Sequence, residues 1–118
     1  MTSATAFRIS AAFGFLAVAL GAFGAHLLKT TLIANGTLAT WQTAALYHLV
    51  HSAVMLALSS RETLSVWAWR FFAAGVVIFS GSLYALALSN VKILGAITPL
   101  GGVCLLGGWL ALARKGSG

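Results

Sequence analysis

Four long apolar runs, separated by short polar connections, make up most of this chain. Each run has about the 20 residues that an α-helix needs to cross the hydrocarbon core of a bilayer. The pattern predicts an all-α integral membrane protein, with four transmembrane helices in an antiparallel bundle that forms one domain over residues 1–118. The predicted spans cover about residues 7–28, 41–59, 71–89 and 93–113.

The second run differs from the others because it carries several polar side chains, namely Tyr47, His48, His51 and Ser52. His48 and His51 are three residues apart, so one face of a helix holds both imidazoles. A polar or ionisable group inside hydrocarbon is costly unless it faces protein or water. We therefore expect this run, although apolar enough to span, to be packed by the other helices on its polar side.

Small residues recur at helical spacing in the remaining runs, and such stripes let helix backbones approach closely in lipid. Pro99 lacks a backbone donor and crowds the preceding turn, so it predicts a kink in the fourth helix. The glycines expected to have structural roles are Gly21, Gly81, Gly101 and Gly108. The stripes are Ala17, Gly21 and Ala25, then Gly81, Ala85 and Ser89, and finally Gly101, Cys104, Gly108 and Ala111.

The connections between the runs are short. Residues 29–40 are expected to form a loop with a turn at Asn35-Gly36, and Trp41 after it is expected at the membrane interface. Trp67, Trp69 and Arg70 are expected to anchor the opposite interface. Cys104 is the only cysteine, so no disulfide forms within the chain.

Composition supports the membrane assignment, because 60% of the residues are hydrophobic, only 7% are charged and the mean hydropathy is +0.99. The net charge of +6 comes from seven Lys and Arg against the single acidic residue Glu62. These basic residues are spread singly rather than in a patch, which excludes nucleic-acid binding. Two of them, Lys29 and Lys92, lie at one predicted surface. The other five, Arg8, Arg61, Arg70, Arg114 and Lys115, lie at the opposite surface, which predicts cytoplasmic N and C termini in a bacterial inner membrane.

Counting residues from the span ends places one polar side chain of each helix at a similar depth. The four residues are His26, His48, Tyr84 and Thr98. These four residues fall in the outer half of the bilayer within a band of roughly 6 Å. His51 lies deeper, near the midplane. We expect either a structural hydrogen-bonded layer or the lining of a cavity open to the outer side. The candidate ligand-binding residues are His26, His48, His51, Tyr84 and Thr98.

Metal, haem and catalytic chemistry have less support. His26 with His48 or His51 would supply two ligands for a metal or a haem iron, but no predicted span contains Asp or Glu. The sequence offers no Ser-His-Asp set and no phosphate-binding glycine loop. We therefore expect no catalytic residue, no metal site and no cofactor.

Several motifs, taken together and in order along nearly the whole chain, resemble a family of small bacterial inner-membrane proteins. It is the family called domain of unknown function 423, whose eukaryotic relatives are called transmembrane protein 256. The resemblance implies four spans and an unassigned role, and it carries over no catalytic residue. His26, His51, Tyr84 and Pro99 match the family pattern, whereas His48 departs from it, so a mechanism that needs both His48 and His51 gains no support. The motifs are residues 21–26 (GAFGAH), 41–44 (WQTA) with Tyr47 and His51, 79–84 (FSGSLY), 98–102 (TPLGG) and 108–109 (GW).

Three functions remain open from the sequence. The first is a non-enzymatic membrane protein that binds or passes a small solute, ion or lipid through the polar layer. The second is a structural or assembly subunit of a larger membrane complex, or a homo-oligomer, joined through the small-residue stripes. The third is a haem or metal carrier. In each case the lipid bilayer is the expected surrounding partner.

Overall fold

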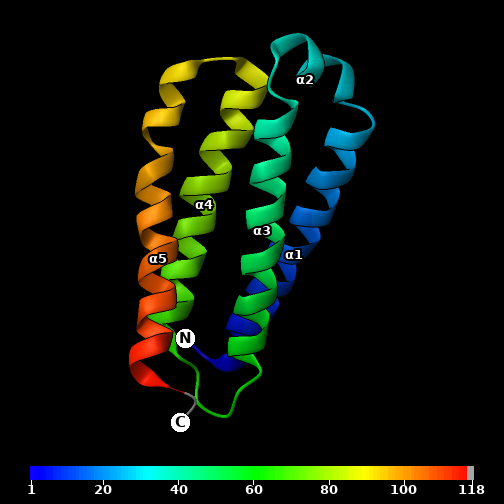
Figure 1. The fold of residues 1–118 in the computed structure, drawn as a ribbon. Coiled ribbons are helices and arrows are strands. Elements are labelled where there is room, and N and C mark those ends of the chain that lie inside the picture. The colour runs from blue at the N-terminus through cyan, green and yellow to red at the C-terminus, as the bar shows by residue number, and fades with distance from the viewer. Residues whose placement is uncertain (117–118) are drawn as a thin grey trace.

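The computed structural model describes residues 1–116, and all of its regular secondary structure within that range is helical. Four long helices run the length of the molecule, and two short helical segments lie in the connections at one end (Figure 1). The helices are α1 Ser3–Ala25, α2 Lys29–Asn35, α3 Leu38–Ser59, α4 Val66–Ser89, the 3-10 helix η1 Lys92–Ala96, and α5 Thr98–Lys115.

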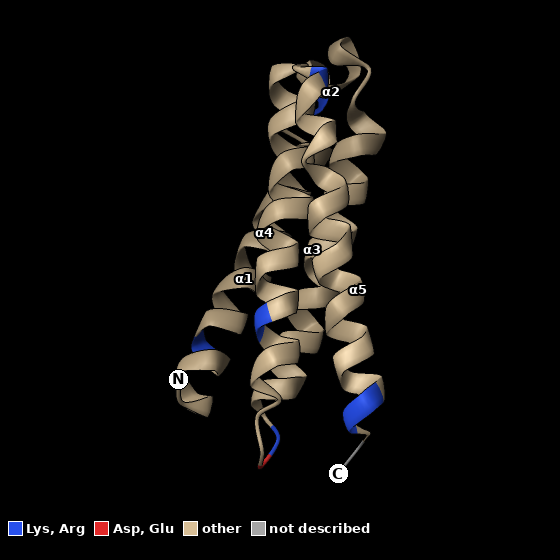
Figure 2. Ribbon diagram, turned by 90° about the vertical axis from the view of Figure 1, so that its left-hand side faces the viewer, with Lys and Arg blue, Asp and Glu red and all other residues tan. Residues whose placement is uncertain are grey.

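The four long helices form an open row rather than a closed bundle. In this row α1 packs against α3, α3 against α4 and α4 against α5, whereas α1 and α5 do not approach each other. Figures 1 and 2 together show that α1 and α4 lie on one side of the row and α3 and α5 on the other. The Cα atoms span 48 × 25 × 20 Å, so the long dimension follows the helix axes. Each side of the row therefore has a lateral space between two helices that are not direct neighbours.

Three of the predicted spans have the length and apolar character needed to cross a membrane: α1, α4 and the combined segment Lys92–Lys115. The predicted second span is not among them. The polar residues Tyr47, His48, His51 and Ser52 lower the apolar character of α3. The sequence-based expectation that this run is apolar enough by itself is therefore not met.

The interior consists of two hydrophobic clusters. The larger one joins α1, α3, α4 and α5 near the end that carries the termini, with Phe72 and Met55 fully buried at its centre. The smaller one joins α2, α3 and α4 around Leu32, Trp41 and Ala87. Trp41 is only 2% exposed, so its ring packs inside the protein, and its expected depth at the membrane interface stays a prediction. Its indole N–H donates to the Leu20 carbonyl of α1 at 2.8 Å.

Glycines bring α4 and α5 into backbone contact. A Cβ added at Gly101 would lie 2.7 Å from the Phe79 Cα, closer than any real side chain allows. One at Gly108 would lie 2.6 Å from the Phe72 ring, and one at Gly75 would lie 2.6 Å from Leu105. The expected close packing at Gly101 and Gly108 is confirmed, whereas Gly75 was not predicted.

The other two predicted structural glycines behave differently. A Cβ at Gly21 would make an ordinary 4.0 Å contact with Ala45, and Gly24 is the position of α1 that packs tightly on Trp41. A Cβ at Gly81 would meet nothing within 4 Å, so Gly81 makes no close contact among the described residues. Its neighbours in the stripe, Ala85 and Ser89, are also exposed.

Two predicted local structures are replaced by others. Pro99 does not kink a long helix, because residues 92–96 form a 3-10 helix and α5 begins at Thr98, with Pro99 in its first turn. Proline is well accommodated there, since the first-turn N–H groups lack helical partners. The expected loop 29–40 contains the short helix α2, which ends at Gly36 with φ of 68°. The side chain of Thr37 then ties this connection to α4 by donating to the Ala87 carbonyl at 2.7 Å.

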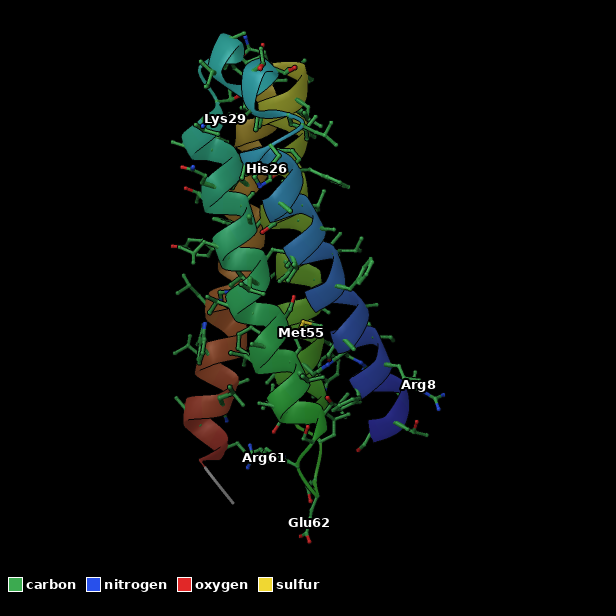
Figure 3. All side chains as sticks on the ribbon, turned by 90° about the vertical axis from the view of Figure 1, so that its right-hand side faces the viewer. Arg8, His26, Lys29, Met55, Arg61 and Glu62 are labelled. Carbon is green, nitrogen blue, oxygen red and sulfur yellow. The ribbon has the colours of Figure 1, made fainter. Side chains whose placement is uncertain are left out.

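Basic residues gather at one end of the molecule (Figure 2). Figure 3 shows Arg8, Arg61 and Glu62 at the end that carries the termini, and His26 and Lys29 toward the opposite end. The structure thus separates the two groups of basic residues as the charge pattern predicts.

Candidate functional site

His51 of α3, which is buried, and Trp109 of α5, which is partly exposed, join the two helices. The backbone carbonyl of Tyr47 lies 2.8 Å from His51 Nδ1, and a carbonyl only accepts, so Nδ1 carries the proton. His51 Nε2 is then free to accept, and Trp109 Nε1–H donates to it at 3.1 Å. Both ring nitrogens of a neutral imidazole are therefore used. The two rings also meet edge to face, with centroids 5.8 Å apart.

His48 belongs to a different pair, between α3 and α4. Its Nδ1 lies 3.0 Å from the Tyr84 hydroxyl, and its ring meets Phe13 of α1 edge to face. Tyr84 in turn packs on Trp41, with ring centroids 4.6 Å apart. The two imidazoles thus serve different interfaces, His51 toward α5 and His48 toward α1 and α4. The shared face predicted for them exists, but it does not create one site.

Hydroxyl groups complete the internal polar contacts. Thr98 of α5 and Ser82 of α4 are 2.6 Å apart, and Ser80 of α4 donates to the Ala44 carbonyl of α3 at 2.8 Å. Trp69 donates to Ser10 across the α1 and α4 side at 2.9 Å. These bonds link each helix to at least one other, which is how polar residues hold helices together in lipid.

His26 does not join these contacts. It ends α1, its side chain is exposed, and it has no side-chain hydrogen bond to any described residue. The expected single layer of His26, His48, Tyr84 and Thr98 is therefore divided into two separate pairs and an isolated histidine. Over residues 1–116 there is no group of three or more His, Cys, Asp or Glu side chains placed to hold a metal.

A groove lies between α3 and α5, with Phe79 of α4 in its lining, and we call it the α3/α5 groove. Its volume is about 410 Å³. Most of its lining atoms are apolar, and Pro99, Val103 and Leu106 at its rim are exposed. It is lined by Tyr47, His51, Phe79, Pro99, Gly102, Val103, Leu105, Leu106 and Trp109.

A smaller groove of about 250 Å³ lies on the other side of the row, between α1 and α4. His48 and Tyr84 lie at its floor, with Gly81 beside them. Because His48 and Tyr84 already bond each other at 3.0 Å, they join α3 to α4 rather than present free polar groups to this groove.

Tyr47 is the polar residue of the α3/α5 groove whose side chain is not paired. Its ring packs on Phe79, with centroids 4.7 Å apart, and stacks on His51 at 6.0 Å. The residue is 41% exposed, and its hydroxyl has no hydrogen-bond partner among the described residues. Sequence reasoning omitted Tyr47 from the candidate site. Its position four residues before His51, on the same helical face, was the available signal.

Comparison with known proteins shows the family. The family described as "Protein of unknown function (DUF423)" matches residues 20–102. The chain is 41% identical to the UPF0382 inner membrane protein YgdD of Escherichia coli K12, with 98% of this chain and 97% of that protein covered. It is 45% identical to the UPF0382 membrane protein SSP2132 of Staphylococcus saprophyticus, with 82% and 83% covered.

No solved structure matches the chain. These relatives are named as membrane proteins, and those of Escherichia coli as inner membrane proteins. Their names agree with the membrane assignment made from the apolar helices and from the sequence resemblance. The chain therefore belongs to the DUF423 family of membrane proteins.

Proposed function

We propose that this protein is a non-enzymatic, four-span inner-membrane protein that binds an amphiphilic lipid in the α3/α5 groove. The first part of the proposal is that α3 also crosses the membrane. It has 22 residues, and its polar side chains His48, His51 and Ser52 are buried and hydrogen-bonded. A helix whose polar groups are satisfied inside the protein presents an apolar surface to lipid despite its composition.

The orientation follows from charge. Five basic residues at the end with the termini, against two at the other end, support cytoplasmic termini by the positive-inside rule. The α3/α5 groove then runs through the hydrocarbon region, where its exposed rim faces acyl chains rather than water.

The Tyr47 hydroxyl is the observation that carries the binding proposal. Tyr47 is nine residues into α3, so its Cα lies about 14 Å along the helix, near the middle of a hydrocarbon core of about 30 Å. Acyl chains offer no hydrogen-bond acceptor at that depth, and an unpaired hydroxyl there is costly. A lipid that places a carbonyl or hydroxyl group in the groove satisfies it, while the apolar lining takes the rest of the molecule.

Passage of an ion or solute through the centre has less support, because the buried polar groups bond one another. Transport paths usually need polar groups that face a water-filled cavity. The pairs His51–Trp109, His48–Tyr84 and Ser82–Thr98 leave few such groups.

The test is to purify the protein in mild detergent and to quantify the co-purified lipids by mass spectrometry. We expect one amphiphile near a 1:1 ratio to protein, enriched over its share in the membrane extract. Tyr47→Phe is expected to weaken its retention about tenfold, since one buried hydrogen bond is worth about 1.4 kcal/mol. Tyr84→Phe is the matched control, because that hydroxyl is bonded to His48 outside the groove. A lipid profile equal to that of the bulk membrane, unchanged by Tyr47→Phe, contradicts the proposal.

Assembly into a larger complex is the second candidate. The stripe Gly81, Ala85 and Ser89 on α4 is exposed, and a Cβ at Gly81 would meet nothing within 4 Å. A small-residue stripe that is unused within the chain suits the close approach of a helix from another chain. Gly81→Leu is expected to abolish such an association without unfolding the protein, and cross-linking in intact membranes measures it.

A further inference from the structure

The start of α4 holds a polar group with no partner. The Ser65 side chain is only 6% exposed, and its Oγ is the one buried side-chain N or O atom of residues 1–116 that lacks a hydrogen-bond partner. A buried hydroxyl without a partner costs free energy, so native proteins rarely keep one without a reason. This position therefore needs an explanation.

Ser65 stands at the position where serine normally caps a helix. Its side chain makes no capping bond to α4, which begins at Val66. The first N–H groups of a helix lack helical acceptors. Trp69 N–H donates to the Ser65 carbonyl at 3.0 Å, which leaves the N–H groups of Val66, Trp67 and Ala68 without a backbone acceptor among the described residues. The three N–H groups therefore belong to the residues that directly follow Ser65, at the positive end of the dipole of a 24-residue helix.

A cavity of about 130 Å³ lies at this helix start. Its lining comes from Ser65, Val66, Trp67 and Ala68 of the α4 start and from Ala111 and Lys115 of α5. Lys115 supplies a full positive charge beside the partial positive charge of the helix terminus. The cavity thus combines a hydroxyl, helix N–H groups and an ammonium group, which are the usual partners of a phosphate oxygen.

The surroundings also favour an anion. This end of the molecule carries five of the seven Lys and Arg residues (Figure 2). The only acidic residue, Glu62, lies at the tip of the turn before α4 and points away from the helices (Figure 3). Trp67, whose ring lies 5.2 Å from the Arg70 guanidinium carbon, marks a level typical of the headgroup region.

We infer that the cavity between the α4 start and Lys115 binds a phosphate group, with Ser65 as a direct donor. The phosphate comes either from the headgroup of an anionic membrane lipid or from free phosphate in the cytoplasm. This site lies at the end of the molecule that carries the termini and does not depend on the α3/α5 groove. The phosphate site and the proposed lipid site in that groove can therefore be tested independently.

Titrations of the ¹⁵N-labelled full chain in neutral detergent micelles, followed by amide NMR, test the inference. One arm adds short-chain phosphatidylglycerol and the other adds inorganic phosphate. We expect saturable shifts of the amides of Val66, Trp67 and Ala68 in at least one arm, and no comparable shifts at Thr98, where α5 begins. Saturation with the lipid alone identifies a headgroup site, and saturation with phosphate alone identifies a free-anion site.

Three variants separate a specific site from general attraction to a basic surface. Ser65→Asp supplies a good helix cap and a fixed negative charge, so it should leave the fold intact and abolish saturation. Lys115→Gln should weaken binding about fivefold, as expected for one basic side chain near the surface. Arg8→Gln removes the same charge from α1 at the same end and should change the affinity less than twofold. Non-saturable shifts, or equal effects of Lys115→Gln and Arg8→Gln, overturn the inference, as does unchanged binding in Ser65→Asp.

Discussion

Replacing Gly101 with alanine tests the contact between α4 and α5. The added Cβ would lie 2.7 Å from the Phe79 Cα, whereas ordinary contact begins at 3.4 Å. Because the obstacle is backbone, no side-chain rotation relieves it, and the two helices must separate by roughly 1 Å. A gap of that size forfeits a quarter to a half of the dispersion attraction along the interface.

The expected loss of stability combines the cost of overpacking with the gain from replacing a helical glycine. Overpacking a well-packed core by one methyl group costs about 1–3 kcal/mol, and a rigid backbone neighbour favours the upper part of that range. Alanine also removes the flexibility of glycine in a helix, which offsets the cost by up to about 1 kcal/mol. We expect a net loss of about 2 kcal/mol in the free energy of unfolding for Gly101→Ala.

The assay is equilibrium unfolding in mixed micelles of mild detergent and dodecyl sulfate, followed by circular dichroism. Gly102→Ala is the matched control, because it lies next in the same helix and its Cβ would make an ordinary 3.9 Å contact with the Phe79 ring. It should be neutral or stabilising. Equal stability of the two variants would refute the packing described for α4 and α5.

Three further predictions concern other parts of the row. Tyr84→Phe removes the hydroxyl bonded to His48 and should lower the free energy of unfolding in the same assay by about 0.6–1.7 kcal/mol, the range measured for such bonds in membranes. Trp41→Phe loses the bond to the Leu20 carbonyl and leaves a void beside Gly24. It should lower the free energy of unfolding by about 2–4 kcal/mol and make α1 sensitive to limited proteolysis. A variant as resistant to the protease as the original protein would contradict this prediction. A reporter active only in the cytoplasm, fused after residue 118, should be active, and activity of a periplasmic reporter there would reverse the orientation.

Much of the fold was predictable because apolar runs and charge are local signals. The runs located all four long helices, and the glycines at positions 101 and 108 correctly marked the tight interface of α5. The helix ends were displaced by several residues, since α4 begins at Val66 rather than near residue 71. Pro99 was misjudged because its effect depends on whether a helix has already begun before it.

The site was less predictable, because it depends on which helices are neighbours. Depth counting placed His48 and Tyr84 at one level, and they do bond. It gave no information on the direction of each side chain, so His26 was included although it is exposed. The partner of His51, Trp109, and the unpaired Tyr47 became apparent only from the arrangement of α3, α4 and α5.

The central claim is that the two histidine side chains of α3, His48 and His51, are used in bonds to other helices, which leaves ligand binding to the lateral groove. The most direct measurement is ¹⁵N NMR of His51 and Trp109 in lipid nanodiscs. The account predicts a neutral His51 with the proton on Nδ1 and a through-bond coupling from the Trp109 indole N–H to Nε2. A His51 protonated on Nε2, or an indole N–H that exchanges freely with solvent, would contradict it.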